Sequence, residues 1–426
     1  MSLVWLRAAS RSARLQRDQR LPPDALRALQ WKRLRRILRH AYDRSPHYRE
    51  KLDRSGVRPE EVRTPEDLAR IPLLRREDLR APEKILARDF SLDRLPSSFS
   101  SGSTAVGTRT YFDPDAWLLG RYLIKLRARL ACGVRPWDRI ALFQWIPAAE
   151  TPLRRHLLRQ RSFGIDRSFD DVLPEVRRYA PTVLYGFPGY LRRLGEAAKG
   201  RIRPRLVFTS GEILDRETRR SIEEAFGAAT YDIYGCTEMK EIAWECPERG
   251  SYHINADWLY VEILPEAAED APARSIVVTS LYNYAMPLIR YLVGDAGRLI
   301  DGVCGCGRTL PLMAPEIGRA VDYVRLPGGG EVSPYTVMTP VEALPGVGQF
   351  EVLQESIDRV VVRIVPSPSY GEGTRREILE SLNSILPGIR VDVEIVDRIE
   401  PQRSGKYRIV QTRIGDRDGR DGAAPR

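Results

Sequence analysis

The pattern of hydrophobic and polar positions divides the chain into a helical start, a long alternating middle and a short closing module. Residues 24–53 place apolar side chains at helical spacing, interrupted at Pro46, which predicts a long helix followed by a short one. Farther along, helical stretches at 115–132 and 214–226 alternate with the β-rich runs RIALFQW, TVLYGF, RLVFTS, TYDIYG and SIVVTSL. This alternation predicts a large α/β domain in which crossover helices join the strands.

The pattern changes after residue 318. Two strands, a helix and a further strand follow one another, which predicts a small α+β module; they lie at 349–355, 359–366, 374–386 and 390–396. The last residues are charged and rich in glycine, which favours disorder. We therefore predict a large N-terminal domain of mixed sheets and helices, a hinge, a small mobile C-terminal domain and a disordered tail, at 1–317, 318–322, 323–413 and 414–426.

Composition narrows the class of protein. The chain has 426 residues, of which 42% are hydrophobic and 29% charged, so it can bury a sizeable core. The net charge of +11 comes from arginines spread among 57 acids, which is typical of a solvated surface and not of a nucleic-acid stripe, although it favours polyanions such as nucleotides. No apolar run reaches 18 residues and no secretory signal is present, so we expect no membrane span and a cytoplasmic protein. The arginine-rich first 17 residues predict a helix on the body of the protein, with a transit peptide or a membrane-surface helix as alternatives.

One stretch, SSFSSGSTAVGTRTYF at 97–112, has the chemistry of a phosphate-binding loop. Backbone N–H groups around Gly102 and hydroxyls from its neighbours can surround phosphate oxygens. The stretch is neither a Walker A loop, since no Gly-Lys-Ser/Thr follows, nor a Gly-x-Ser-x-Gly elbow. By itself, such a cluster is more often a flexible surface loop.

Four further stretches follow this loop in a fixed order. They are YDIYGCTE at 231–238, PLIRYLVGD at 287–295, IGRAVDYVRLPGGGEVSP at 317–334 and QRSGKYR at 402–408. With them, the sequence resembles the adenylate-forming superfamily of acyl-CoA synthetases, and within it the phenylacetate-CoA ligases and CapK-like proteins. The segment at 41–80 resembles the same two groups. Each motif alone is weak, whereas the ordered set is specific.

The resemblance implies a two-step reaction. ATP and a carboxylic acid, an aromatic acid being one candidate, form an acyl-adenylate, and the acyl group then passes to CoA, a carrier-protein thiol or an amine. Because two anions must meet, such a site needs positive charge, hydrogen-bond donors and Mg²⁺. The alternatives are an adenylyl transferase that makes no thioester and a catalytically silent nucleotide-binding relative. The identity of the acid, the acceptor and the oligomeric state stay open.

The resemblance also implies roles for single residues. Lys406, Thr237 and Glu238 would be catalytic: Lys406 would neutralise charge between carboxylate and α-phosphate, Thr237 would reach the α-phosphate and Glu238 would hold Mg²⁺. Tyr234 would stack on adenine and Asp295 would bind the ribose hydroxyls. The full set of implied nucleotide-binding residues is Ser100, Ser101, Gly102, Ser103, Thr104, Gly211, Glu212, Asp232, Tyr234, Gly235, Asp295 and Arg319.

The chain departs from the family pattern at two of these motifs. The family loop reads Ser-Gly-Ser/Thr-Thr-Gly followed by Lys-Pro or similar, whereas this chain continues after Thr104 with Ala105, Val106 and Gly107, which predicts a weaker or differently shaped hold on phosphate. Arg109 is a candidate for the missing positive charge. At the hinge, Val321 precedes Asp322 where the family has two acids. The altered loop keeps the catalytically silent alternative open, and the hinge departure predicts an atypical pivot between the domains.

A set of cysteines and one histidine predicts a metal site. Cys246, His253, Cys304 and Cys306 offer three thiolates and one imidazole, a full tetrahedral set for Zn²⁺, and Cys-x-Cys between glycines is typical of a tight metal-binding turn. A zinc ion with four protein ligands would be structural. The alternative is a set of unconnected buried thiols and a surface histidine.

The acid-binding pocket is the least specified part of the site. Phe143, Trp145, Tyr185 and Phe187 lie at the ends of two predicted strands, where α/β proteins bind ligands, and are candidates to line a pocket for an aryl acid. The alternative is that at least two of them are core residues.

Overall fold

The described residues form two compact units. The computed structural model describes the chain except residues 1–2, 101–107, 145–158, 166, 213, 265–273, 317–323, 333, 343, 400–409 and 415–426. The first unit holds the described residues up to 316, and the second holds those from 324 onward. No described helix is both long and apolar enough to cross a bilayer.

An eleven-stranded sheet organises the first unit, in the order β10-β11-β12-β13-β9-β8-β7-β6-β5-β3-β4. Its parallel half consists of β3 (Ile140–Gln144), β4 (Gln160–Gly164), β5 (Val183–Gly186), β6 (Leu206–Ser210) and β7 (Ala229–Cys236). Its antiparallel half consists of β8 (Lys240–Glu245), β9 (Tyr252–Ile254), β10 (Leu259–Ile263), β11 (Ser275–Ser280), β12 (Tyr291–Ile300) and β13 (Leu312–Glu316). The α/β fold class is therefore confirmed.

Four of the five predicted strands lie in the parallel half of the sheet, but the fifth, SIVVTSL, does not. The runs that became β3, β5, β6 and β7 are parallel, as crossover helices require. The run SIVVTSL became β11, which pairs antiparallel with both of its neighbours. Apolar content indicates that a strand is buried but does not indicate the direction of its partner, which explains the error.

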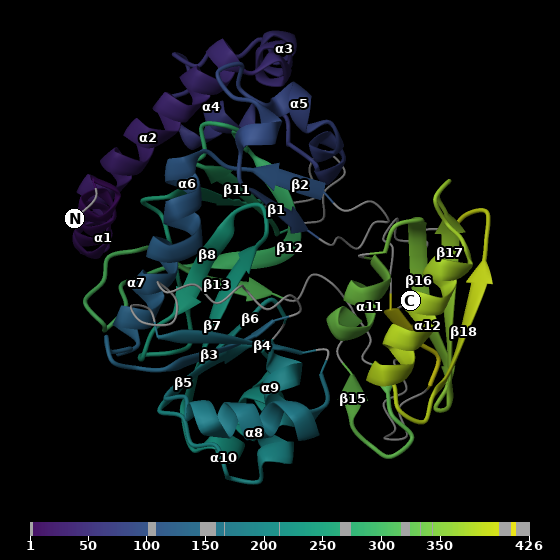
Figure 1. Cartoon of the computed structure of the whole chain (residues 1–426). Helices are drawn as coiled ribbons and strands as arrows, with labels where there is room; N and C mark the ends of the chain where they lie inside the picture. Colours follow the sequence, from purple (N-terminus) through teal and green to yellow (C-terminus); the bar gives the residue numbers. More distant parts are fainter. Residues whose placement is uncertain are drawn as a thin grey trace, which may run out of the picture. The chain divides into compact units, whose positions relative to one another are not determined.

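Helices cover both faces of the parallel half. On one face, α8 (Phe169–Tyr179), α9 (Pro188–Ala198) and α10 (Arg216–Phe226) enclose a core that includes Phe143, Phe163 and Leu191 (Figure 1). The Asp215 carboxylate caps α10 by accepting from two backbone N–H groups. The other face carries α6 (Pro114–Leu118), the π-helical turn η3 (Leu119–Leu123) and α7 (Ile124–Ala131), which together form the helical stretch predicted at 115–132.

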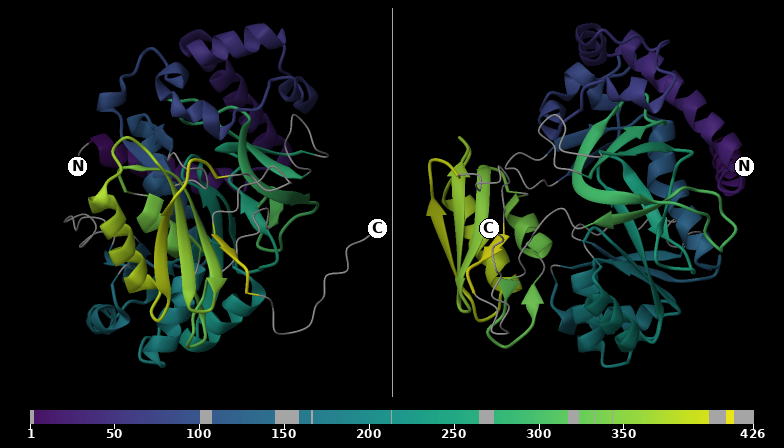
Figure 2. Two further views of the ribbon diagram at one scale, coloured as in Figure 1. Left: turned by 90° about the vertical axis from the view of Figure 1, so that its right-hand side faces the viewer. Right: turned by 180° about the vertical axis from the view of Figure 1, so that it is seen from behind.

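The N-terminal helices pack on the first unit. They are α1 (Leu3–Asp18), α2 (Pro23–Arg44) and α3 (Pro46–Ser55), and the break between the last two falls at Pro46 as predicted. Leu15 of α1 is buried beside α7, while α2 runs along the outside of the unit and passes β10 (Figures 1 and 2). Shorter elements complete the unit: α4 (Pro65–Ala69), η1 (Arg76–Arg80), α5 (Pro82–Ile85), η2 (Leu92–Arg94), β1 (Ser97–Ser100) and β2 (Thr108–Tyr111).

The second unit is a small α+β module. Its four-stranded sheet has the order β18-β17-β16-β19, formed by β16 (Val347–Ser356), β17 (Arg359–Pro366), β18 (Arg390–Ile395) and β19 (Val410–Thr412). Helix α12 (Glu372–Ile385) connects the parallel strands β17 and β18 and lies along one face of the sheet (Figure 2). The short strands β14 (Val324–Arg325) and β15 (Glu331–Val332) and helix α11 (Pro334–Glu342) precede this sheet.

Candidate functional site

The turn between β7 and β8 holds the predicted nucleotide motif. Tyr234 and Gly235 lie near the end of β7, and a Cβ atom at Gly235 would lie 2.2 Å from the carbonyl oxygen of Lys240. Only glycine therefore permits this close approach of the two strands. The Tyr234 hydroxyl donates to the Asp295 carboxylate of β12 at 3.1 Å, across 61 residues of sequence. Two predicted nucleotide ligands are thus neighbours.

Asp232, two residues earlier on β7, is held in an internal network. It is 6% exposed and accepts hydrogen bonds from the hydroxyls of Thr209 at 2.5 Å and Tyr252 at 2.9 Å. Burial, together with the neighbouring carboxylate of Glu245, raises the pKa of Asp232 to about 7, although the hydrogen bond from Thr209 opposes this rise. Because both of its oxygens already have partners, any contact with adenine would use their remaining lone pairs.

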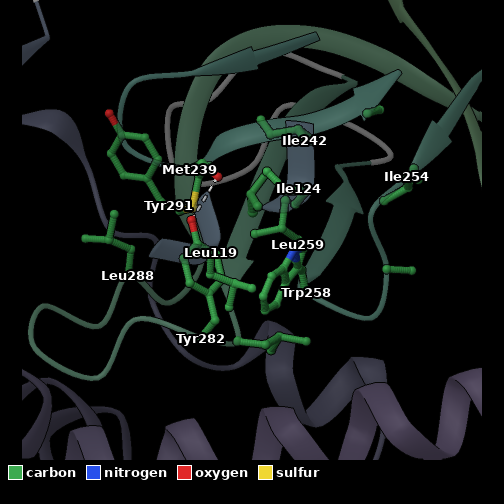
Figure 3. Packing of buried hydrophobic residues seen from close by; sticks show 14 of the residues in the cluster. Leu119, Ile124, Met239, Ile242, Ile254, Trp258, Leu259, Tyr282, Leu288 and Tyr291 are labelled. Carbon is green, nitrogen blue, oxygen red and sulfur yellow. Dashed lines mark hydrogen bonds between the residues drawn. The ribbon is translucent and has the colours of Figure 1, made fainter. Parts of the chain in front are cut away.

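The residues after Gly235 are anchored in the core. Met239 is fully buried, and its carbonyl accepts from the Tyr282 hydroxyl at 3.1 Å; Figure 3 shows both among the buried side chains of this cluster. Glu238 is 5% exposed and accepts a hydrogen bond from Tyr291, whose pKa rises through burial and through this carboxylate. Thr237, between the anchored residues and Cys236, is partly exposed. The anchors therefore fix the turn that carries Thr237 and Glu238.

Gly211 and Glu212 follow the end of β6. Gly211 has φ +85°, and a Cβ there would lie 2.9 Å from the ring of Phe187, so the ring packs directly against this turn. The Glu212 carboxylate accepts from the backbone N–H of Gly189 at 3.0 Å, in the first turn of α9. The predicted residues Gly211, Glu212 and Phe187 are therefore brought together at the carboxyl ends of β5 and β6.

The structure separates two predicted pocket residues. Phe143 is 2% exposed and packs against Phe163 and Tyr190 beneath α8 and α9. Tyr185 lies opposite Leu142 on the paired strand and therefore points to the other face of the sheet. Phe143 is thus a core residue, and it does not share a pocket with Tyr185, because successive side chains of β3 point to opposite faces.

Cys246, His253, Cys304 and Cys306 meet in one cluster. Their ligand atoms all lie within 4.8 Å of one another, with 3.6 Å between the sulfurs of Cys246 and Cys304 and 3.3 Å between Cys306 Sγ and His253 Nε2. A tetrahedral zinc with Zn–S bonds of about 2.3 Å separates two sulfurs by roughly 3.8 Å, so the donor set fits. Burial lowers the pKa of His253 to about 4, which favours the neutral, ligating imidazole.

Several predicted residues lie outside the described part of the chain. These are Ser101, Gly102, Ser103, Thr104, Trp145, Arg319 and Lys406. Ser100 ends β1, whose partner β2 begins at Thr108, so the β1–β2 hairpin flanks the predicted phosphate loop.

A group of charged side chains next to the motif was not predicted from the sequence. Lys240 donates to the Ser98 hydroxyl of β1, and its ammonium lies 4.4 Å from the ring centre of Phe112. Burial, together with the charge of Lys125, lowers the pKa of Lys240 to about 7. Glu241, beside it, is 5% exposed. The sequence did contain a signal for this group. Arg121, Lys125 and Arg129 are spaced four residues apart on a helical stretch, which places their basic side chains on one face of the helix.

Comparisons with known proteins agree with the resemblance. The model of the CapK C-terminal domain family matches residues 325–413. The phenylacetate-coenzyme A ligase of Thermus thermophilus is 30% identical over 361 residues, which cover 77% of this chain and 77% of that protein. The enzyme of the same name from Pseudomonas putida is 28% identical over 72% of this chain and 73% of its own length. A crystal structure of 2-hydroxyisobutyryl-CoA ligase with 2-HIB-AMP and CoA has a TM-score of 0.63 and 22% identity over 93% of this chain and 92% of that one, which shows a shared fold.

Proposed function

Since this chain belongs to the phenylacetate-CoA ligase family, we propose that it joins a carboxylic acid to the α-phosphate of ATP, which releases pyrophosphate and leaves an acyl-adenylate. The thiol of CoA would then take the acyl group and release AMP. The observation that carries the proposal is the similarity to the Thermus thermophilus ligase over 77% of both chains. The acid-thiol ligase activity follows from the family, whereas the acid and the roles of single residues are specific to this chain.

The nucleotide site that we propose is centred on Tyr234 and Asp295. Tyr234 would present its ring to adenine, and Asp295 would accept hydrogen bonds from the two ribose hydroxyls, which a carboxylate can do because it has two acceptor oxygens. Their mutual contact at 3.1 Å supports a common ligand. Thr237 would contact the α-phosphate, and Gly211 and Glu212 would line the nucleotide from the neighbouring strand end.

The remaining catalytic roles concern charge. Glu238 would hold Mg²⁺, which neutralises the phosphates when bound; residues 100–104 and Arg319 would hold phosphate oxygens. Lys406 would bring positive charge between the carboxylate and the α-phosphate, and loss of one such preorganised charge typically lowers the rate by roughly 10²–10³. Rotation of the small domain about the hinge at 318–322 would withdraw Lys406 after the first step and let the acceptor thiol reach the acyl-adenylate.

Zinc is proposed as a structural ion. Cys246, His253, Cys304 and Cys306 would fill all four tetrahedral positions, which leaves no position for a reacting water. The ion would tie β8 and β9 to the turn between β12 and β13.

Acid-dependent exchange of labelled pyrophosphate into ATP tests the adenylation step, and the mass of the product formed with CoA tests the second step. Asp295→Ala should raise the KM for ATP by about ten- to a hundredfold, as expected for lost hydrogen bonds to a charged group. Asp301→Ala, which changes an exposed acid six residues later in the chain, is the matched control and should leave the KM unchanged. Exchange without any thioester would point to the adenylyl transferase, and no exchange with any acid would overturn the proposal.

A further inference from the structure

Glu241 is a buried acid whose surroundings leave its carboxylate open to a ligand. It lies on β8 opposite Gly235, and only 5% of it is exposed. Neither of its carboxylate oxygens has a hydrogen-bond partner in the described part of the chain. A buried carboxylate that accepts no hydrogen bond destabilises a fold, so such a group is normally kept for a reason other than stability.

Two basic side chains of α7 face the same region. Lys125 and Arg129 are one helical turn apart, and both lie over the ring of Tyr185, at 5.7 Å and 5.4 Å from its centre. Arg129 is 8% exposed, and its Nε has no hydrogen-bond partner among the described residues. Burial raises the pKa of Glu241, and the charges of Lys125 and Arg129 oppose this rise, so the three groups are close enough to interact electrostatically.

This cluster lies beside the proposed nucleotide site. Tyr185 is near the carboxyl end of β5 and hydrogen-bonds Ser210, the last residue of β6, which directly precedes Gly211. Glu241 pairs with Gly235 at the end of β7. Ligands of parallel sheets bind at the carboxyl ends of the strands, where these three strands end together. The cluster is therefore placed to contact a molecule that reacts at the nucleotide.

We propose that Glu241 and Arg129 form a subsite for a hydroxyl group of the acid, so that the substrate is a hydroxylated carboxylic acid. This inference rests on the proposed function and specifies its substrate class. A hydroxyl can donate to Glu241 and accept from Arg129 Nε, which matches one unused acceptor group and one unused donor.

Other substituents match the subsite less well. The carboxylate of Glu241 would repel a second carboxylate on the substrate, and the positive charges of Lys125 and Arg129 would repel an ammonium group. An unsubstituted ring would leave Glu241 and Arg129 without partners. A site built around hydrogen bonds rejects an analogue that lacks the bonding group, because its own buried polar atoms then stay unpaired.

The test compares phenylacetate with its 2-, 3- and 4-hydroxy derivatives in acid-dependent pyrophosphate exchange. For the wild type, we expect kcat/KM for at least one hydroxylated acid to exceed that for phenylacetate by about ten- to a hundredfold, as for hydrogen bonds to charged groups. Glu241→Leu should bring this ratio close to one by lowering the value for the hydroxylated acid, while that for phenylacetate stays the same or rises. Glu241→Gln, which keeps one acceptor oxygen, should retain part of the preference.

Glu248→Gln is the matched control, because Glu248 is an exposed acid after the same strand and should leave the ratio unchanged. A ratio near one for every hydroxylated acid in the wild type overturns the subsite, and this outcome does not depend on whether any variant folds. A preference that survives in Glu241→Leu also overturns it. If phenylacetate and its derivatives support exchange equally, the result contradicts the subsite but agrees with the ligase function. If no acid supports exchange, the result contradicts the proposed ligase function itself.

Discussion

Two arginines of α7, only two residues apart, have opposite surroundings. Arg127 is fully buried and binds both oxygens of Asp257, at 2.8 Å and 2.6 Å, as well as Asn255 and the carbonyl of Leu15. Arg129 is also buried, but it lies over the face of the Tyr185 ring, and its Nε has no hydrogen-bond partner among the described residues. Successive helical residues turn by about 100°, so the two side chains point in nearly opposite directions.

The difference separates buried charge that holds the fold from buried charge that is available to a ligand. Both terminal nitrogens of the Arg127 guanidinium donate hydrogen bonds, and only its Nε has no partner among the described residues. These bonds connect α7 to α1 and to the segment between β9 and β10. The Nε of Arg129 on α7 and the carboxylate of Glu241 on β8 have no hydrogen-bond partner in the part of the chain that the structure describes. Both residues are buried arginines of one helix, so their partners distinguish their roles.

The largest effect is expected from breaking the paired arginine. Arg127→Met leaves the Asp257 carboxylate buried without its cation and should lower the free energy of unfolding by about 3–5 kcal/mol. Arg129→Met, the matched control on the same helix, removes no ion pair formed by the described residues and should lower it by at most about 1 kcal/mol. Urea denaturation of both variants measures the two values. Equal losses would contradict the distinction between the two arginines.

The cluster of three cysteines and His253 differs from both arginines, because the proposed partner of its buried side chains is a zinc ion. Zinc at a free concentration of a hundred times its Kd should stabilise the protein by about 2.7 kcal/mol relative to chelated protein. Thermal unfolding with and without zinc measures this difference, and elemental analysis of protein never exposed to a chelator should find one zinc per chain. Cys304→Ser should abolish the response, and a wild-type protein indifferent to zinc would rule the site out.

Asp232 provides a pH-dependent test within the hydroxyl-bonded network. Because burial raises its pKa to about 7 from an ordinary value of 3.8, the folded state holds more protons than the unfolded state between these values. Stability should therefore fall as the pH rises from about 4 to 7, by up to about 1.4 kcal/mol per pH unit. Denaturation at pH 5, 6, 7 and 8 measures the slope. Asp232→Asn should flatten it, and identical profiles for the two proteins would show that another group is responsible.

The smallest effect is expected at Glu241. Glu241→Gln removes a buried charge that accepts no hydrogen bond from the described residues, so the free energy of unfolding should stay the same or rise by about 1 kcal/mol or less. The same substitution at Glu245, whose two oxygens bind Arg219 at 2.7 Å and 2.8 Å, should clearly destabilise the protein. A loss at Glu241 as large as that at Glu245 would place Glu241 with the structural charges.

Some features of the fold and of the site followed from local pattern. The helix break at Pro46 and the strands β3, β5, β6 and β7 were predictable, because proline and apolar runs act through their immediate neighbours. The antiparallel pairing of β11 was not predictable, because direction depends on a partner elsewhere in the chain. Among aromatic residues, the core position of Phe143 was decided by which face of β3 the helices α8 and α9 cover.

By itself, the sequence determined the motif order, the family and the chemistry that each motif can supply, since these depend on residue types and their spacing. Only the tertiary structure decided which side chains meet. It placed the Cys246 and Cys304 sulfurs 3.6 Å apart and joined Tyr234 to Asp295. It also gave Arg127 its partner Asp257, whereas the Nε of Arg129 has no hydrogen-bond partner among the described residues. The physical reason is that a buried charge is stabilised or destabilised by atoms within a few ångströms, and the chain brings those atoms from positions more than fifty residues away.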